Sequence, residues 1–239
     1  MIWAAVAILL LLGAGGQVWL RSLRPASAPV MTEGFIAALG GLRSVAAEVV
    51  WFRADRLQEE GRYVELAQLA STLAFLEPHT PEVWSYAAWN LAYNISIMMP
   101  THEDRWRWVL AAMRLLRDEG LRINPRESEL YRELAWMFEV KIGADIDAAA
   151  PLYREKWREI MRGVLADGDW ARVGMEPKMV DYVSKIADID DWEDPQASAI
   201  YWAVLGLDRA DAKDANRPFL TEIIRQAKVI YTRNHANML

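Results

Sequence analysis

Residues 188–194 hold five carboxylates in a seven-residue stretch and could, by residue type, bind a calcium ion. Calcium takes oxygen ligands, and the EF-hand loop needs glycine at its sixth position and glutamate at its twelfth. Counted from Asp188, those positions are Glu193 and Ala199, so the motif is not met. We interpret the run as solvated loop and helix-start charge, and we predict no metal site.

The three histidines, His79, His102 and His235, offer no catalytic arrangement. None lies at a spacing from a serine or carboxylate that suggests a triad or zinc site, and His102-Glu103 lacks the second histidine of the metalloprotease helix. The chain has no cysteine, which excludes disulfides, thiolate zinc sites and thiol catalysis. It also has no glycine-rich phosphate loop. We therefore predict that the protein is not an enzyme, with no catalytic residue and no cofactor.

Aromatic residues are the other candidates for a site, because the chain holds 12 tryptophans. Five of them fall in segments with helical periodicity and could line a groove for a peptide, lipid or pigment: Trp84, Trp89, Trp136, Trp157 and Trp202. The alternative is that they fill the space between packed helices, as large aromatic side chains usually do. Of the two, we favour core packing.

The segments that would position these residues recur in a fixed phase. Pro78 is followed six residues later by Trp84, and Pro125 is followed six residues later by Tyr131. Ten and thirteen residues after each proline come a small and then a large apolar residue: Ala88 and Leu91, Ala135 and Phe138. Such a repeated phase indicates an array of helical repeats, so we predict an all-α fold of antiparallel helix pairs.

The segment from Ala54 to Pro78 resembles a tetratricopeptide repeat, a helix-turn-helix unit of 34 residues. It has that family's order of small residue, large residue, glycine turn, aromatic residue, small residue and closing proline: Ala54, Leu57, Gly61, Tyr63, Ala70 and Pro78. The resemblance implies a solenoid over residues 35–161 that binds other proteins. Its units would be residues 47–80, 81–127 and 128–161, followed by divergent helices and a cap over 162–239.

The second unit is thirteen residues longer than one repeat, and we expect Met98 to Arg107 to hold the extra residues as a loop or longer turn. Insertions in repeat arrays map to one face, often the binding face. Aromatic residues and arginines are favoured at interface hot spots. We therefore predict partner-binding residues beside this insertion, the alternative being a helix that simply packs: Arg105, Trp106, Arg107 and Trp108.

The N-terminal residues 2–20 carry no charge and, as a helix, would span about 28 Å, close to the hydrocarbon thickness of a bilayer. Trp3 and Trp19 flank the run, as interfacial aromatic residues do. We predict a transmembrane anchor at 1–24 and a linker at 25–34. A cleaved signal peptide is the alternative, but the segment has no basic region before its apolar part.

Three glycines in this anchor, Gly13, Gly15 and Gly16, would let a second membrane helix approach closely. They could equally be tolerated in a lone anchor, and the sequence leaves both interpretations open. Arg21 and Arg24 follow the anchor, and the positive-inside rule therefore places the helical domain in the cytoplasm, with the periplasm as the alternative.

The segment 39–43 leading into 50–54 resembles membrane-anchored bacterial proteins of the tetratricopeptide class, which implies a bacterial inner membrane. The net charge of −6 and the absence of a basic block argue against nucleic acid as a partner. We expect a membrane-anchored scaffold or adaptor for a protein partner. The alternatives are an accessory structural subunit of a large membrane complex and a ligand-binding protein that uses the aromatic groove.

Overall fold

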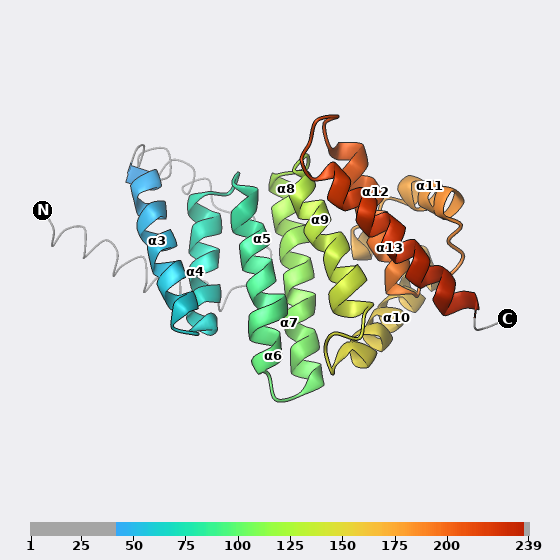
Figure 1. Cartoon of the computed structure of the whole chain (residues 1–239), viewed down its shortest axis with the longest axis horizontal. Helices are drawn as coiled ribbons and strands as arrows, with labels where there is room; N and C mark the ends of the chain where they lie inside the picture. Colours follow the sequence, from blue (N-terminus) through green and yellow to red (C-terminus); the bar gives the residue numbers. More distant parts are fainter. Residues whose placement is uncertain (1–41, 237–239) are drawn as a thin grey trace, which may run out of the picture. The chain divides into compact units, whose positions relative to one another are not determined.

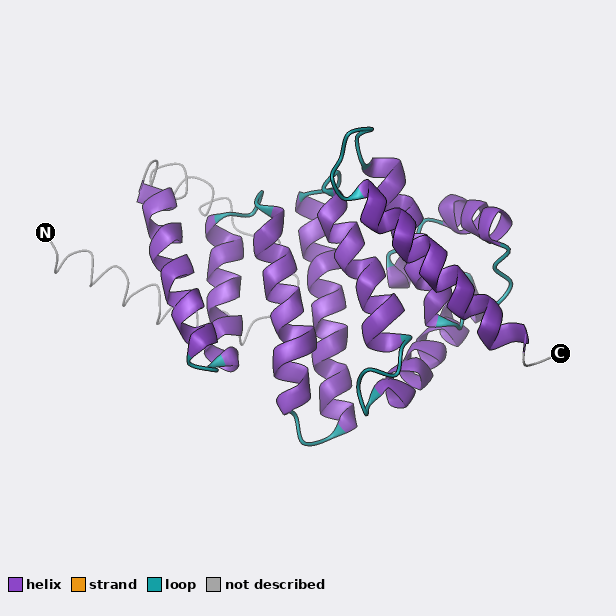
Figure 2. Ribbon diagram, in the orientation of Figure 1, coloured by secondary structure: helices purple, strands orange, loops and turns teal. Residues whose placement is uncertain are grey.

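A computed structural model describes residues 42–236, and its regular structure over that range is helical, without a strand (Figures 1 and 2). The fold class is therefore all-α, as the sequence predicts. The chain divides into two compact units, residues 1–53 and 54–239, each of which is considered by itself.

The predicted anchor, with Trp3, Gly13, Gly15, Gly16 and Trp19, lies outside the described residues, as does the linker. Between residues 42 and 236, no helix combines the length and the apolar character needed to cross a bilayer.

The helices follow one another with short connections. Their bounds are α3 (Leu42–Glu59), α4 (Tyr63–Leu76), α5 (Pro81–Trp89), α6 (Ser96–Met98), α7 (His102–Arg114), α8 (Leu121–Ile123), α9 (Ser128–Trp136), α10 (Ala150–Asp167), α11 (Pro177–Ala187), α12 (Pro195–Arg209) and α13 (Arg217–Ala236). A 3₁₀ turn, η5 (Trp170–Val173), precedes α11.

Between residues 42 and 236, three helices continue through a π-helical segment: η2 (Asn90–Ile95) joins α5 to α6, η3 (Leu115–Gly120) joins α7 to α8, and η4 (Met137–Ile142) extends α9. In a π-helical turn the hydrogen bond runs from i to i+5, so each segment holds one more residue than an α-helical turn would. These segments give continuous helices over 81–98, 102–123 and 128–142.

Local signals explain where the helices begin. Pro81 stands in the first turn of α5, where its missing amide hydrogen costs nothing. Thr101 caps α7 by accepting a hydrogen bond from the Asp104 amide at 3.1 Å. Asp194 caps α12 in the same way, through the amide of Gln196 at 2.8 Å. Gly61 has a φ of +69°, the left-handed conformation that ends α3 as predicted.

The expected loop at Met98–Arg107 is wrong. Only residues 99–101 lie outside the helices there, because α6 ends at Met98 and the Thr101 cap starts α7 at His102. The extra residues of the second unit lengthen its two helices instead, and each of those helices contains one of the π-helical segments.

Within residues 54–239, α4, α5, α7 and α9 follow one another in chain order, and α5 packs on each of the other three (Figure 1). We expected residues 148–161 to return along the helix that starts at Ser128. The helix there, α10, packs on η4, the last part of that helix, and on α7, while the first part, α9, packs mainly on α12. Residues 195–207 and 217–232, whose apolar periodicity predicts a last antiparallel pair of helices, form α12 and α13, which pack closely on each other.

The recurring phase of the sequence has a matching geometry. The indole nitrogen of Trp84 donates to the carbonyl oxygen of Pro78 at 2.9 Å, and the hydroxyl of Tyr131 donates to that of Pro125, also at 2.9 Å. Both aromatic residues are buried, as are the small residues that follow them, Ala88 and Ala135. The predicted helix starts at Pro81 and Ser128 are the observed starts of α5 and α9.

A glycine lies against each of these aromatic residues. A methyl group added at Gly120 would come within 3.4 Å of Cβ of Trp84, and one added at Gly206 would come within 2.8 Å of Cβ of Tyr131. Small residues at such points let two helices approach closely. Since Gly206 belongs to α12, this close approach is one reason why α12, and not α10, lies along α9.

Candidate functional site

An open groove of about 330 Å³ lies between α5, α9 with η4, and α13. It is lined by three aromatic residues, four charged residues and two others: Trp89, Trp136, Phe219, Arg132, Glu133, Glu139, Glu222, Ile223 and Gln226. The aromatic side chains are exposed to an unusual degree for their size, at 42% for Trp89, 43% for Trp136 and 60% for Phe219. Aromatic residues that line a concave surface are typical of a binding site.

The two tryptophans of the groove occupy equivalent positions in two repeat units. Trp89 is the last residue of α5 and Trp136 the last residue of α9, each eleven positions after its proline and directly before a π-helical segment. Trp84, Trp157 and Trp202, by contrast, are buried. The five tryptophans that the sequence groups together therefore divide into three that build the core and two that line the groove.

Glu139 is the buried acid of the groove. It is 2% exposed, and its Oε2 atom has no hydrogen-bond partner among the described residues. Gln196 of α12 holds the backbone at this point, donating to the carbonyl oxygen of Glu139 at 3.1 Å. Burial, followed by the neighbouring charge of Glu222, raises the pKa of Glu139 to about 7.

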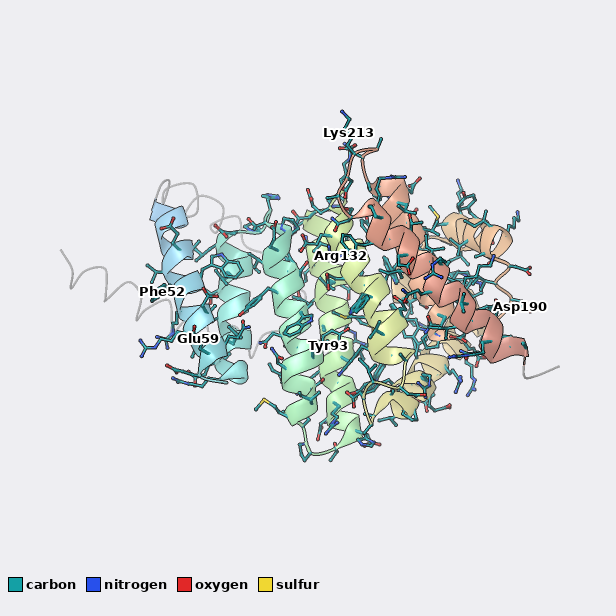
Figure 3. The ribbon with its side chains drawn as sticks, viewed as in Figure 1. Phe52, Glu59, Tyr93, Arg132, Asp190 and Lys213 are labelled. Atoms are coloured by element: carbon teal, nitrogen blue, oxygen red, sulfur yellow. The ribbon has the colours of Figure 1, made fainter. Side chains whose placement is uncertain are left out.

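The other charges that line the groove have partners. Arg132, labelled in Figure 3, donates to Glu133 at 2.7 Å and to Asn216. Its guanidinium lies 5.9 Å from the ring centre of Phe219. Glu222 accepts hydrogen bonds from Arg225 and Gln226, and the Arg225 bond holds the pKa of Glu222 at about 2. The groove therefore combines apolar walls with one buried carboxyl group whose Oε2 is unpartnered.

A buried ionic cluster is linked to Trp89 through Tyr93. Trp89 stacks on Tyr93 with ring centres 5.6 Å apart, and the Lys141 ammonium lies 5.2 Å from the Tyr93 ring centre. Lys141 in turn donates to Asp147 at 2.7 Å, with both side chains almost fully buried. These consecutive contacts connect Trp89 to the Lys141–Asp147 ion pair through Tyr93.

Asp147 is the centre of that cluster. It also accepts hydrogen bonds from Arg105 at 3.2 Å, from the hydroxyl of Tyr153 at 3.1 Å and from the amide of Ala149 at 2.9 Å. Burial opposes its ionisation, but the hydrogen bond from Lys141, with that from Ala149, lowers the pKa of Asp147 to about 2. The cluster fastens the loop before α10 to α7 and η4.

The residues predicted to bind a partner occupy different environments. Trp106 is 6% exposed and packs on Tyr153, with ring centres 6.0 Å apart. Arg105 belongs to the Asp147 cluster, Trp108 is half-buried, and Arg107 is exposed and paired with Asp104 at 3.0 Å. They do not line the groove. Partner binding through them stays a prediction, with Arg107 and Trp108 as the accessible members.

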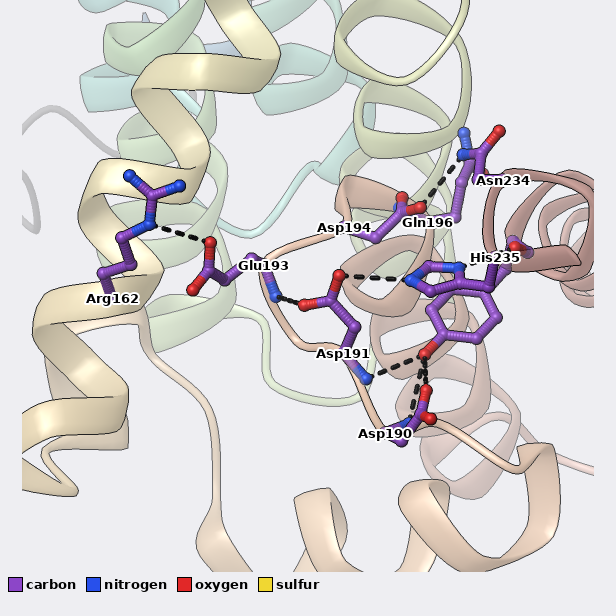
Figure 4. A network of polar contacts seen from close by, with 9 residues as sticks. Arg162, Asp190, Asp191, Glu193, Asp194, Gln196, Asn234 and His235 are labelled. Atoms are coloured by element: carbon purple, nitrogen blue, oxygen red, sulfur yellow. Dashed lines mark hydrogen bonds and ion pairs between the residues drawn. The ribbon is translucent and has the colours of Figure 1, made fainter. Parts of the chain in front are cut away.

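The acidic run 188–194 forms a connecting loop whose carboxylates bind protein donors (Figure 4). Asp190 accepts from the Tyr231 hydroxyl at 2.6 Å, Asp191 lies 3.1 Å from Nε2 of His235, and Glu193 pairs with Arg162 at 2.9 Å. His235 also places Nδ1 2.8 Å from the Tyr231 carbonyl oxygen. Burial opposes the charged imidazole, but the bonds to that carbonyl and to Asp191 raise its pKa. The loop thus fastens the end of α13.

Sequence reasoning missed Glu139 and Phe219. Glu139 stands in an apolar stretch, Trp136-Met137-Phe138-Glu139, and this is the one signal that could have marked it as a buried acid. Phe219 lies 83 positions after Trp136, and no periodic pattern joins the two.

Comparison with known proteins found no family model, no curated protein and no solved structure similar to this chain.

Proposed function

We propose that this protein is a membrane-anchored scaffold or adaptor whose helices stack as a tetratricopeptide-like solenoid and bind a protein partner. The N-terminal segment, residues 1–24, would hold it in a bacterial inner membrane with the helical domain in the cytoplasm. It would act without catalysis or a cofactor.

The solenoid part of the proposal is supported by the repeated geometry of its second and third units. The hydrogen bonds Trp84–Pro78 and Tyr131–Pro125 are equivalent in sequence spacing and length. Trp89 and Trp136 occupy equivalent ends of α5 and α9. The anchor and its orientation rest on the sequence alone.

The single observation that carries the binding role is the groove with its three exposed aromatic side chains. Burying them would remove a large apolar area from water, and aromatic residues in such positions dominate the free energy of binding at protein interfaces. The position of this groove at corresponding repeat positions fits the use of stacked repeats as binding surfaces.

The experiment uses the full chain with a C-terminal tag, extracted from the host membrane in mild detergent and analysed by size and mass spectrometry. We expect a protein to co-purify with the wild type and to be lost from the double variant Trp89→Ala/Trp136→Ala. Tyr182→Ala, which removes an exposed aromatic residue of α11 outside the groove, is the matched control and should retain the partner. Recovery of no protein, or the same recovery with the groove variant, would contradict the proposal.

The same preparation separates an adaptor from an accessory structural subunit. A constitutive subunit would migrate in one defined high-mass complex and would be released by Gly15→Leu/Gly16→Leu, because bulky residues prevent close helix approach in the membrane. An adaptor would bind its partner whether or not these glycines are replaced.

A further inference from the structure

The groove contains a buried carboxyl group without a counter-ion, and this restricts what can occupy it. Glu133 is bound by Arg132, and Glu222 is bound by Arg225 and Gln226. Glu139 alone among the lining carboxylates has a buried oxygen with no partner in the described part of the chain. Ionised and uncompensated, such a group is costly, and a cation at this point would remove the cost.

The aromatic walls of the groove also favour a cationic occupant. The faces of tryptophan and phenylalanine rings attract cations, and tryptophan does so most strongly. Trp89 and Trp136 extend from neighbouring helices and Phe219 extends from α13, so an entering group would meet aromatic rings on several sides. One cation already uses this surface, since the guanidinium of Arg132 lies over the Phe219 ring.

The size of the groove limits the occupant further. About 330 Å³ lies at the lower end of the range for small-molecule sites. A long, thin side chain with an apolar stem and a charged end matches a groove lined by exposed aromatic rings and a buried acid. Lysine and arginine are the protein side chains with that form.

We propose that the groove receives a single lysine or arginine side chain of a protein partner, with Glu139 as its counter-ion. The proposal rests on the scaffold role proposed above and specifies the chemistry of its partner. The stem would lie between Trp89 and Trp136, with the charged group beside the Glu139 carboxyl group.

The test measures binding of defined probes to the full chain in detergent at pH 8 by ligand-observed saturation-transfer NMR. Tryptophan fluorescence would not be selective for the groove, because the chain holds 12 tryptophans. The probes are N-acetyl-lysine methylamide, N-acetyl-arginine methylamide and N-acetyl-norleucine methylamide, which has an apolar stem and no charge. We expect a basic probe to bind at least tenfold more tightly than the norleucine probe. Equal binding of charged and neutral probes would overturn the proposal.

Glu139→Gln keeps the shape of the side chain and removes its charge, and it should abolish the tenfold preference. Unchanged binding of the basic probes to this variant would overturn the proposal. Trp89→Leu, at a side chain that is already part-exposed and so has little effect on folding, should weaken the charged and neutral probes together. Tyr182→Phe is the control that should change neither.

A lipid head group is the competing occupant, and vesicles distinguish it. The protein could bind phosphatidylethanolamine vesicles tenfold more tightly than phosphatidylglycerol vesicles and lose that preference in Glu139→Gln. This result would assign the groove to a lipid head group and overturn the proposal of a protein side chain.

Failure of this inference is distinct from failure of the scaffold role. A partner that co-purifies through Trp89 and Trp136 but binds Glu139→Gln equally well would leave only the scaffold role standing.

Discussion

Tyr131 donates a hydrogen bond to the carbonyl oxygen of Pro125, six residues earlier and 2.9 Å away, and so closes the turn that leads into α9. The corresponding carbonyl of Pro78 accepts both the indole of Trp84 and the side-chain amide of Asn124. The same turn is thus fixed by one side chain in one unit and by two in the other. This difference makes Tyr131 the more informative position for substitution.

Tyr131→Phe should lower the free energy of unfolding by about 1 kcal/mol, because it removes one hydrogen bond and leaves the Pro125 carbonyl without this donor. Chemical denaturation of the wild type and the variant measures the difference. Tyr182→Phe removes a hydroxyl from an exposed tyrosine and is the control. Equal stability of wild type and Tyr131→Phe would mean that this hydrogen bond contributes nothing net.

Gly206→Ala should destabilise the protein by about 1–2 kcal/mol. The added methyl group would lie 2.8 Å from Cβ of Tyr131 and 3.1 Å from Leu220, and this overpacking exceeds the gain in helix propensity. Gly120→Ala is the matched comparison, since its nearest neighbours would be 3.3 to 3.4 Å away. We expect it to be neutral or stabilising within about 1 kcal/mol, and the reverse order of the two variants in thermal unfolding would contradict the packing of α12 on α9.

Glu139→Gln should stabilise the protein more at pH 8 than at pH 5. The pKa of Glu139 is about 7 in the folded chain and near 4.5 when exposed, so folding favours the protonated acid. Stability therefore falls as the pH rises from about 4.5 to about 7 and is level above that. Glutamine removes that loss, and the gain at pH 8 should be on the order of 1–3 kcal/mol.

The remaining charges of the groove, Arg132, Glu133 and Glu222, are present in both proteins, so the difference between the two unfolding curves isolates Glu139. A constant difference between pH 5 and pH 8 would show that this carboxyl group is not buried as described.

Asp147→Asn should cost about 3–5 kcal/mol, because it leaves the ammonium of Lys141 buried without its counter-ion. The double variant Lys141→Met/Asp147→Asn should be less destabilised than Asp147→Asn alone, since the fully buried ammonium is then removed as well. Urea denaturation of the wild type, Asp147→Asn, Lys141→Met and the double variant measures this coupling. A double variant as unstable as the sum of its single variants would argue against a direct interaction.

Local sequence signals predicted the part of the fold that local interactions decide. Pro81 and Ser128 mark the starts of α5 and α9, and the helices at 195–209 and 217–236 lie where apolar periodicity places them. The expected loop near Met98 was wrong because extra residues can lengthen a helix as readily as a turn.

The partners of the helices and the floor of the groove could not be predicted in this way. That α12 lies along α9 depends on the contact between Gly206 and Tyr131, which are 75 positions apart. The burial of Glu139 follows from the arrangement of α12 and α13 around η4, and no sequence period encodes it. Trp84 and Trp89 have the same residue type and belong to the same helix. Their exposure differs only because Trp84 lies on the packed face of that helix and Trp89 on its solvent face.

The three π-helical segments have a consequence for the evolution of the chain. Each holds one residue beyond the α-helical spacing, within 90–95, 115–120 and 137–142, while the helix on either side remains regular. Deleting a single residue there would restore an ordinary α-helix and leave the helix on either side in its present phase, because the wide turn absorbs the extra residue. Homologous chains should therefore differ by one-residue gaps inside these helices, not in the connecting loops, and a chain lacking the extra residue near 137–142 would change the local spacing around Glu139 while α9 keeps its contacts.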